Sequence, residues 1–309
     1  MPEPAADPHL GGIHHSFAEV NGVRLHYASV GSGRLLVFLH GFPEFWRAWK
    51  NQITEFGRDF LAVAPDLRGY NLSSKPVDVD QYQLKHLVED VGALSEHLDP
   101  EKLILVGHDW GGVVAWAFAS QYPHYLEKLI IVNAPHPAVF DRELRENPAQ
   151  QQASQYMLVF RSADAEQLLS AGNYSALDQN ILQPGLRSGY FNEEDRRAHL
   201  DAWSQPGALT GGLSYYRAAH VGPRGKSGQG SRQLVAPAGS LTVRVPTLVI
   251  WGEKDPYLLT GNLTRRLTAF GQYFPHSVGH SARFNFHLPA TTGSTHRPWL
   301  GAASAPAPV

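Results

Sequence analysis

The amino-acid sequence predicts an α/β protein with a mostly parallel sheet, helices on both faces of the sheet and an inserted helical cap. Two observations predict this class. Short apolar runs that are typical of buried strands alternate with segments of helical periodicity, and the alternation stops over residues 137–221, where helical patterns occur without a strand run. The chain has 309 residues, which is enough for one large domain with an insertion.

Six apolar runs are predicted to be strands. The later runs are continuously apolar, as expected of strands that are buried on both faces. In parallel sheets of this kind, ligands bind at the carboxyl ends of the strands, so we expect a site there. The runs are VRLHYASV (23–30), RLLVFLHG (34–41), FLAVAPDL (60–67), KLILVGHD (102–109), KLIIVNAP (128–135) and PTLVIWGEKD (246–255).

Helical periodicity is clear between the third and fourth runs, where apolar residues form a single stripe. The stripe consists of Leu84, Leu87, Val88, Val91, Leu94 and Leu98.

The helical insertion and the segments on either side of it predict how the chain is organised into core, cap, linker and terminal segments. A glycine-rich segment follows the insertion and predicts a flexible link back to the sheet. The predicted parts are a disordered N-terminal segment 1–15, a first part of the core 16–136, a helical cap 137–221, a flexible linker 222–240, a second part of the core 241–275 and an atypical C-terminal tail 276–309.

Composition excludes several classes of function. The formal net charge is −2 and basic residues form no stripe, so we expect neither nucleic acid nor an anionic membrane as a partner. Cysteine is absent, which excludes disulfides and thiolate chemistry. No apolar run reaches membrane-spanning length and the N-terminal segment has no signal-peptide pattern, so we expect a cytoplasmic protein. The 16 histidines include no H-E-x-x-H motif, so we expect no metal. Oligomeric state is left open.

The run that ends in Gly107-His108-Asp109-Trp110-Gly111 has the spacing of a nucleophile elbow. In such an elbow, small flanking residues allow a strained turn between a strand and a helix that exposes the central side chain. Serine is the usual residue at that position, and here it is Asp109. The pattern therefore predicts a carboxylate nucleophile.

Two further loops complete a predicted active site. The segment LHGFPEFW (39–46) follows a buried strand, and its turn can direct the Phe42 backbone N–H into the site. Together with the Trp110 N–H it predicts an oxyanion hole. The segment WGEKDPYL (251–258) places Asp255 where an acid that orients a catalytic histidine is expected, whereas Glu253 is interpreted as a solvated loop charge.

These motifs resemble those of one known family. H-G-F-P-E-x-W, D-L-R-G-Y (66–70), G-H-D-W-G-G and W-G-E-K-D are similar to the motifs of the soluble epoxide hydrolases in the α/β-hydrolase superfamily, and the likeness extends from about residue 16 to residue 270. The resemblance implies an α/β-hydrolase fold with Asp109 as the nucleophile.

The resemblance also implies a pair of cap tyrosines that polarise the epoxide oxygen. Tyr156 lies in an early cap segment, and Tyr216 immediately precedes Arg217, as the family pattern requires. Tyr215 lies about 100° away around a helix and is expected to pack elsewhere.

The resemblance leaves a hydrolytic dehalogenase as the alternative enzyme, because those enzymes share the Asp nucleophile. The Trp110 indole is a feature of haloalkane dehalogenases, but those typically have Asn at the position of Phe42. Haloacetate dehalogenases follow the nucleophile with Arg, where this chain has Trp110. Both comparisons favour an epoxide.

The predicted function is therefore an epoxide hydrolase that opens an apolar epoxide to a vicinal diol through a covalent aspartyl ester. Its partners are a small apolar epoxide and water, and it needs no cofactor. A carboxylate nucleophile suits this reaction because the ester that it forms is hydrolysable, whereas serine would leave a stable ether. The residues predicted to contact substrate are His40, Pro43 and Met157.

The general-base histidine is the remaining element that the family pattern requires. Its expected place, roughly thirty residues after Asp255, makes His280 the best candidate, with His276 behind it. The flanking residues lack the aromatic loop of the family, and the last forty residues show neither a strand nor a closing helix. An exposed tail histidine is the alternative interpretation of His280.

A frameshift is one hypothesis for this C-terminal segment. PATTGST (289–295) can be encoded by codons that, read two nucleotides later, give Ser-His-Tyr-Trp-Val-Asn, which is close to the histidine loop of the family. In that case the chain would be an impaired homologue without its general base. The nucleotide sequence of the gene tests this hypothesis.

Overall fold

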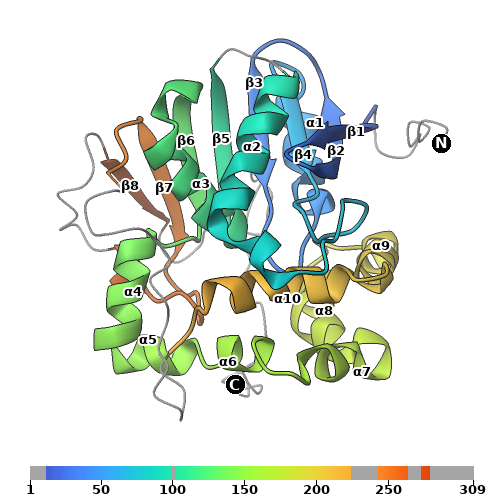
Figure 1. Cartoon of the computed structure of the whole chain (residues 1–309), viewed down its shortest axis with the longest axis vertical. Helices are drawn as coiled ribbons and strands as arrows, with labels where there is room; N and C mark the ends of the chain where they lie inside the picture. Colours follow the sequence, from blue (N-terminus) through green and yellow to red (C-terminus); the bar gives the residue numbers. More distant parts are fainter. Residues whose placement is uncertain (1–11, 99–101, 224–241, 264–272, 279–309) are drawn as a thin grey trace.

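An eight-stranded sheet forms the centre of the structure, a computed structural model that describes residues 12–98, 102–223, 242–263 and 273–278 (Figure 1). The strand order is β1-β2-β4-β3-β5-β6-β7-β8. The six neighbouring strands β4, β3, β5, β6, β7 and β8 run parallel to one another, while β2 is antiparallel to both β1 and β4. The strands are β1 (His14–Val20), β2 (Val23–Val30), β3 (Leu35–Leu39), β4 (Leu61–Pro65), β5 (Leu103–His108), β6 (Leu126–Val132), β7 (Thr247–Gly252) and β8 (Tyr273–Val278).

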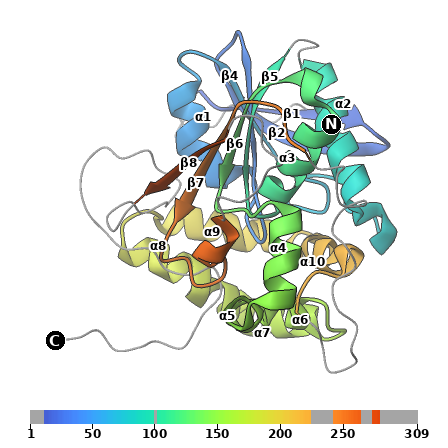
Figure 2. The same cartoon turned by 90° about the vertical axis from the view of Figure 1, so that its left-hand side faces the viewer.

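Helices cover both faces of this sheet, which explains why the strand runs are continuously apolar. The helices α1 (Lys50–Phe56), α2 (Leu84–Leu98) and α3 (Trp110–Gln121) are arranged so that α1 lies on one face and α2 with α3 on the other (Figure 2). Side chains along a strand alternate between the two faces. On β3, Leu35 and Val37 pack in the cluster that includes α2 and α3, whereas Leu36 and Phe38 pack with α1.

The apolar stripe predicted for residues 84–98 is confirmed as the packing face of α2, because Leu87, Val88, Val91 and Leu94 are buried. Three short 3₁₀ helices also lie in this half of the chain, namely η1 (Trp46–Trp49), η2 (Val79–Tyr82) and η3 (Pro123–Tyr125).

Among the described residues between β6 and β7, seven α-helices lie in the interval where the sequence shows no strand run, and they cover the carboxyl ends of the strands (Figure 1). The α7 segment is broken by non-helical backbone at Ala171–Tyr174. The helices are α4 (Pro137–Glu146), α5 (Pro148–Ala153), α6 (Tyr156–Phe160), α7 (Ala165–Leu177), α8 (Gln183–Arg187), α9 (Glu193–Ser204) and α10 (Ala208–Ala219), with the π-helical turn η4 (Asp178–Leu182) between α7 and α8. The division at residues 137 and 221 stays a prediction.

Buried polar contacts fix the helix α9 to the loop after β3. Glu44 and His199 form a buried hydrogen-bonded pair at 2.8 Å. The Trp203 indole N–H donates to the carbonyl oxygen of Pro43 at 2.7 Å. Because the same loop carries Phe42, these contacts tie the position of the cap helices to the carboxyl end of the sheet.

The structure differs from the sequence-based prediction at both ends of the sheet. Residues 14 and 15, assigned to a disordered segment, begin β1, because Ile13 is fully buried and the His15 ring stacks on His26 at 5.1 Å. The edge strand β8 overlaps the predicted tail and pairs with β7. An edge strand is held on one side by backbone hydrogen bonds, so its residues need not show the apolar run of a central strand. Residues 224–240 of the predicted linker 222–240 and residues 279–309 of the predicted tail 276–309 lie outside the described residues.

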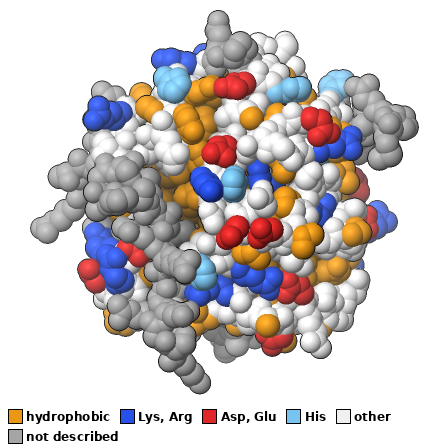
Figure 3. All heavy atoms as spheres, viewed as in Figure 1, with side chains coloured by type: hydrophobic (Ala, Val, Ile, Leu, Met, Phe, Trp, Pro, Cys, Tyr) orange, Lys and Arg blue, Asp and Glu red, His pale blue; other side chains and the backbone are white. Residues whose placement is uncertain are grey.

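The surface shows charge of both signs. On the face drawn in Figure 3, basic and acidic side chains of the described residues are interspersed, and neither sign forms an extended patch. No helix within the described parts of the chain has both the length and the apolar character needed to cross a membrane.

Asp66, which directly follows β4, is a fully buried carboxylate that joins three segments. It accepts hydrogen bonds from the His26 ring at 2.6 Å and from the Trp46 backbone N–H at 3.0 Å. The Asn71 amide is a third donor at 2.8 Å. Burial by itself raises the pKa of Asp66, but the charge and hydrogen bond of His26 and the Trp46 N–H outweigh it, so the pKa lies below its usual value. The first residue of the D-L-R-G-Y motif is thus structural.

Replacing Asp66 with Ala should lower the free energy of unfolding by about 3–5 kcal/mol, because His26 and two other donors lose their acceptor inside the protein. Urea denaturation at pH 7 measures the change. Asp59→Ala, at an exposed position, is the control and should stay within about 0.5 kcal/mol of the parent protein. Equal stability of the two variants would contradict the role assigned to Asp66.

Candidate active site

The strand β5 ends in a tight turn that exposes Asp109. The backbone of Asp109 has φ +50° and ψ −121°, a strained conformation for a residue other than glycine, and α3 begins at the next residue. A Cβ atom on Gly111 would lie 2.3 Å from the carbonyl oxygen of Leu39, so only glycine fits against β3 there. The nucleophile elbow predicted from the sequence has this geometry.

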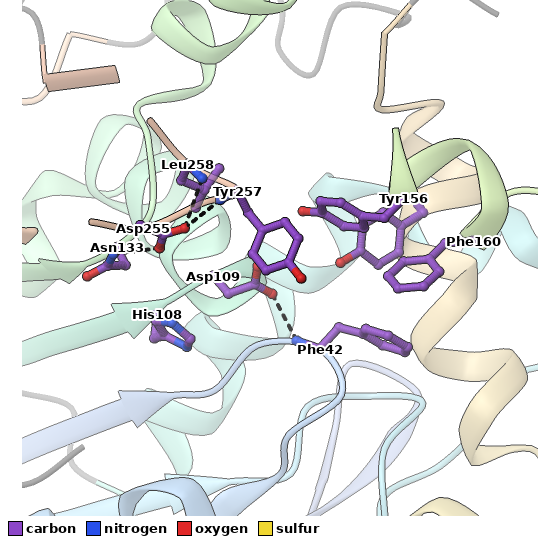
Figure 4. A pocket seen from close by; sticks show the side chains of 10 residues that line it. Phe42, His108, Asp109, Asn133, Tyr156, Phe160, Asp255, Tyr257 and Leu258 are labelled. Carbon is purple, nitrogen blue, oxygen red and sulfur yellow. Dashed lines mark hydrogen bonds between the residues drawn. The ribbon is translucent and has the colours of Figure 1, made fainter. Parts of the chain in front are cut away.

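The carboxylate of Asp109 lies against backbone donors. The Phe42 N–H donates to Oδ1 of Asp109 at 2.9 Å, and the Trp110 N–H also hydrogen-bonds this carboxylate (Figure 4). The backbone of Gly41 lies close to the Asp109 side chain, because a Cβ on Gly41 would be only 2.3 Å from the Cβ of Asp109. The Phe42 N–H, one of the two groups predicted to form an oxyanion hole, thus holds Oδ1 of Asp109.

Burial dominates the electrostatics of Asp109. Burial raises the pKa of Asp109 to about 6, the hydrogen bonds from Phe42 and Trp110 act in the opposite direction, and the charges of Asp255 and Glu44 raise the pKa further. Asp109 is thus ionised at neutral pH but poorly solvated, which is the state expected of a carboxylate nucleophile.

Two cap tyrosines face this carboxylate. Tyr156 begins α6 and Tyr216 lies on α10, with ring centroids 6.5 Å apart. Burial raises the pKa of each tyrosine well above its usual value, and the charge of Asp109 adds to the effect. Both hydroxyls therefore remain protonated and can donate hydrogen bonds.

The neighbours of these tyrosines have other contacts. The Trp110 ring meets the Tyr216 ring edge to face, with centroids 5.2 Å apart. Tyr215 is fully buried and donates to the carbonyl oxygen of Arg68 at 2.9 Å, which confirms that it packs away from the site.

Asp255 is held from two sides after the end of β7. The backbone N–H groups of Tyr257 and Leu258 donate to Oδ1 at 2.8 and 3.0 Å. The Asn133 amide, at the end of β6, donates to Oδ2 at 2.8 Å. Burial raises the pKa of Asp255 and these hydrogen bonds oppose that effect. Glu253 is exposed, as the sequence predicted.

One pocket brings these residues together. Five lining residues were not predicted, although the sequence contains signals for some. Asn133 follows a strand run directly, and Phe160 lies four residues after Tyr156 on the same helix face. The lining residues are Phe42, His108, Asp109, Asn133, Tyr156, Phe160, Tyr216, Asp255, Tyr257 and Leu258.

The three predicted substrate contacts lie outside this lining. His40 is fully buried, its Nδ1–H donates to the Gly41 carbonyl oxygen and its Nε2 accepts from the Leu67 N–H, so both ring nitrogens are used by the backbone. The Pro43 carbonyl oxygen accepts from the Trp203 indole. Met157 is buried in α6 and packs toward Gly222. The contact of His40, Pro43 and Met157 with substrate thus stays a prediction, and the described pocket lining does not include them.

The predicted general base His280 lies outside the described residues. His276 lies in β8, where its backbone pairs with Ile250 on β7. Within the described ranges, no group of three or more His, Cys, Asp or Glu side chains is placed to hold a metal ion.

Comparisons with known proteins agree in fold and in function names. A family model described as alpha/beta hydrolase fold matches residues 34–288. AB hydrolase superfamily protein YfhM of Bacillus subtilis is 42% identical over 255 residues, which cover 81% of this chain and 84% of that protein. Epoxide hydrolase 4 of Mus musculus is 35% identical over 259 residues, which cover 82% of this chain and 68% of that protein. The crystal structure of a Bacillus megaterium epoxide hydrolase with an inhibitor matches with a TM-score of 0.78 at 39% identity and covers 85% of this chain and 92% of that chain.

The raised pKa of Asp109 predicts that its charge destabilises the folded protein above pH 6. The folded protein keeps this proton up to pH about 6 and the unfolded chain loses it near 3.8, so this group lowers stability as pH rises between these values. Asp109→Asn removes the charge. The free energy of unfolding of Asp109→Asn, relative to that of the parent protein, should rise by about 2 kcal/mol as the pH increases from 4 to 7.5.

Calorimetric melting at several pH values measures this gain. Asp201→Asn, at an exposed position, serves as the control and should show no such trend. A difference between Asp109→Asn and the parent protein that is the same at pH 4 and pH 7.5 would show that Asp109 is not an unfavourably buried charge.

Proposed function

This chain belongs to the α/β-hydrolase fold family and, within it, to the epoxide hydrolases, and from that premise we propose that it opens a small apolar epoxide to a vicinal diol through an ester on Asp109. One observation carries the proposal. Asp109 has one oxygen fixed by the Phe42 N–H while two protonated tyrosines, Tyr156 and Tyr216, line the same pocket.

In the first step, Oδ2 of Asp109 attacks a ring carbon of the epoxide and the bond from that carbon to the ring oxygen breaks. Tyr156 and Tyr216 donate hydrogen bonds to the departing oxygen, and one of them transfers a proton to it. Their raised pKa values support this role, because the hydroxyls stay protonated at neutral pH and an alkoxide is a much stronger base than a phenolate. The product is a hydroxyalkyl ester of Asp109.

In the second step, a water molecule attacks Cγ of Asp109. Negative charge then develops on Oδ1, which already accepts a hydrogen bond from the Phe42 N–H, and we assign the Trp110 N–H as its second donor. The base that activates the water takes one of its protons and returns it to the departing alkoxide as the tetrahedral intermediate collapses to diol and carboxylic acid. The acid then gives its proton to the tyrosinate left by the first step, which restores both the carboxylate of Asp109 and the tyrosine. We assign the activation of water to a histidine oriented by Asp255, with His280 as the candidate. No step needs a cofactor.

Two alternatives remain distinguishable by product. A hydrolytic dehalogenase would use the same Asp109, but the Trp110 indole that could bind a halide packs edge to face against the Tyr216 ring. An impaired homologue without a general base would form the ester and keep it. Incubation with styrene oxide and with a haloalkane, followed by assays for diol and halide and by mass spectrometry of Asp109, separates these outcomes.

Tyr216→Phe should slow ester formation by roughly 100-fold, because one donor to the developing oxyanion is lost from a buried site. The rate is measured by intact-protein mass spectrometry after rapid mixing with styrene oxide. The neighbouring variant Tyr215→Phe loses a hydroxyl that binds the Arg68 carbonyl outside the pocket, so it is the control and should react as fast as the parent protein. Equal rates of ester formation in the two variants would show that the Tyr216 hydroxyl does not assist ring opening.

Ester formation should also depend on pH, because only ionised Asp109 is a nucleophile. The rate should rise about tenfold per unit below pH 6 and level off above it, following the pKa of about 6. The same mixing experiment between pH 4.5 and pH 8 provides the profile. A rate independent of pH in this range would contradict a pKa of about 6 for Asp109.

A further inference from the structure

Gln150, on the cap helix α5, is fully buried and uses its whole amide group in hydrogen bonds. Its Oε1 accepts from the Leu259 N–H at 3.0 Å and from the Asn262 amide at 2.8 Å. Its Nε2 donates to the Tyr257 carbonyl oxygen at 2.6 Å and to the Ser154 hydroxyl at 2.9 Å. An amide has two donor hydrogens and two acceptor lone pairs, so all four positions are filled.

Three of these four bonds reach one short segment, residues 257–262, which follows Asp255. The cap and this segment also approach closely at a second point, where a Cβ on Gly261 would lie 2.5 Å from the Glu143 carboxylate on α4. Gln150 therefore fixes the segment to the cap at both of its ends.

The same segment holds the carboxylate of Asp255. The Tyr257 N–H donates to Oδ1 of Asp255, and the Tyr257 carbonyl oxygen accepts from the Gln150 amide. The backbone of Tyr257 therefore connects the Gln150 and Asp255 side chains. Figure 4 shows Tyr257 between Asp255 and Tyr156, and the rings of Tyr257 and Tyr156 meet edge to face at 5.1 Å. Displacement of this segment would move the donors that orient Asp255.

We propose that Gln150 is a positioning residue for the hydrolytic step, acting through the Tyr257 segment to orient Asp255. The inference rests on the proposed function, because it assigns Asp255 to hydrolysis of the ester. Ester formation depends on Asp109, on Phe42 and on the hydroxyls of Tyr156 and Tyr216, which lie on other elements, although the Tyr156 ring contacts Tyr257. Loss of Gln150 should thus affect the two steps unequally.

The test follows a limited pulse of styrene oxide by intact-protein mass spectrometry, which measures formation and decay of the Asp109 ester separately. In Gln150→Leu, decay should slow by about 10- to 100-fold while formation changes by less than about threefold, because a shift of the orienting donors misplaces the base and not the nucleophile. Gln152→Leu, at an exposed position on the same helix, is the control and should leave both rates unchanged.

Gln150→Glu provides a second variant of nearly the same shape. One oxygen of the new carboxylate still accepts from Leu259 and Asn262, but the other faces the Tyr257 carbonyl oxygen and repels it. A buried carboxyl in this place becomes protonated more readily and can then donate to Tyr257. The slowing of decay relative to the parent protein should therefore be larger at pH 8 than at pH 6, a trend that a purely structural role of Gln150 would not produce.

The other outcomes are distinct. Unchanged decay in both variants, or equal slowing of formation and decay in Gln150→Leu, overturns the role of Gln150 and leaves the proposed function intact. A parent-protein ester that forms but never decays also overturns it, because Asp255 then performs no hydrolysis, although Asp109 remains the nucleophile. Neither ester nor diol from the parent protein contradicts the proposed function itself.

Discussion

The hydrogen bond from the Phe42 N–H to Asp109 is the contact on which the arrangement of the site depends. It requires β3 and β5 to be neighbours, with Leu39 paired to Gly107, so that the two loops start at the same edge of the sheet. It also requires Gly41 and Gly111, since a side chain at either position would collide with Asp109 or with β3. The strained backbone of Asp109 is maintained because packing on both sides leaves no other path for the chain.

Burial near this contact creates a specific electrostatic environment. The residues described as lining the pocket include two carboxylates and no Lys or Arg. Asp109 and Asp255 are therefore held by hydrogen bonds from backbone and amide groups, and no ion pair within the described part of the chain involves either carboxylate. This arrangement keeps Asp109 a reactive anion at neutral pH and keeps Tyr156 and Tyr216 protonated. A buried cation beside Asp109 would lower its pKa and weaken it as a nucleophile.

Much of the fold could be predicted from the sequence, because the central strands and α2 carry apolar patterns that burial requires. The elbow at Asp109 and the tyrosine Tyr216 were identified because their motifs combine several residue types at fixed spacing. The edge strands β1 and β8 were missed because backbone pairing, rather than an apolar run, forms them.

Side-chain direction was the other limit of prediction. His40 belongs to the H-G-F-P motif, yet its ring turns toward the Leu67 backbone, and nothing in the motif indicates this. Gln150 lies in a polar stretch with three consecutive glutamines, of which tertiary packing buries this one. Its role depends on contacts more than one hundred residues away in sequence, so no local pattern could have identified it.

The origin of the oxygen in the diol tests the central claim most directly. In one turnover in ¹⁸O-labelled water with enzyme in excess, attack by Asp109 predicts that the diol contains no label and that the peptide with Asp109 gains one ¹⁸O atom. Water adds to the carbon of the ester, so the diol receives an oxygen of the original carboxylate. A labelled diol and an unlabelled Asp109 after the first turnover would show direct attack by water and would contradict the account.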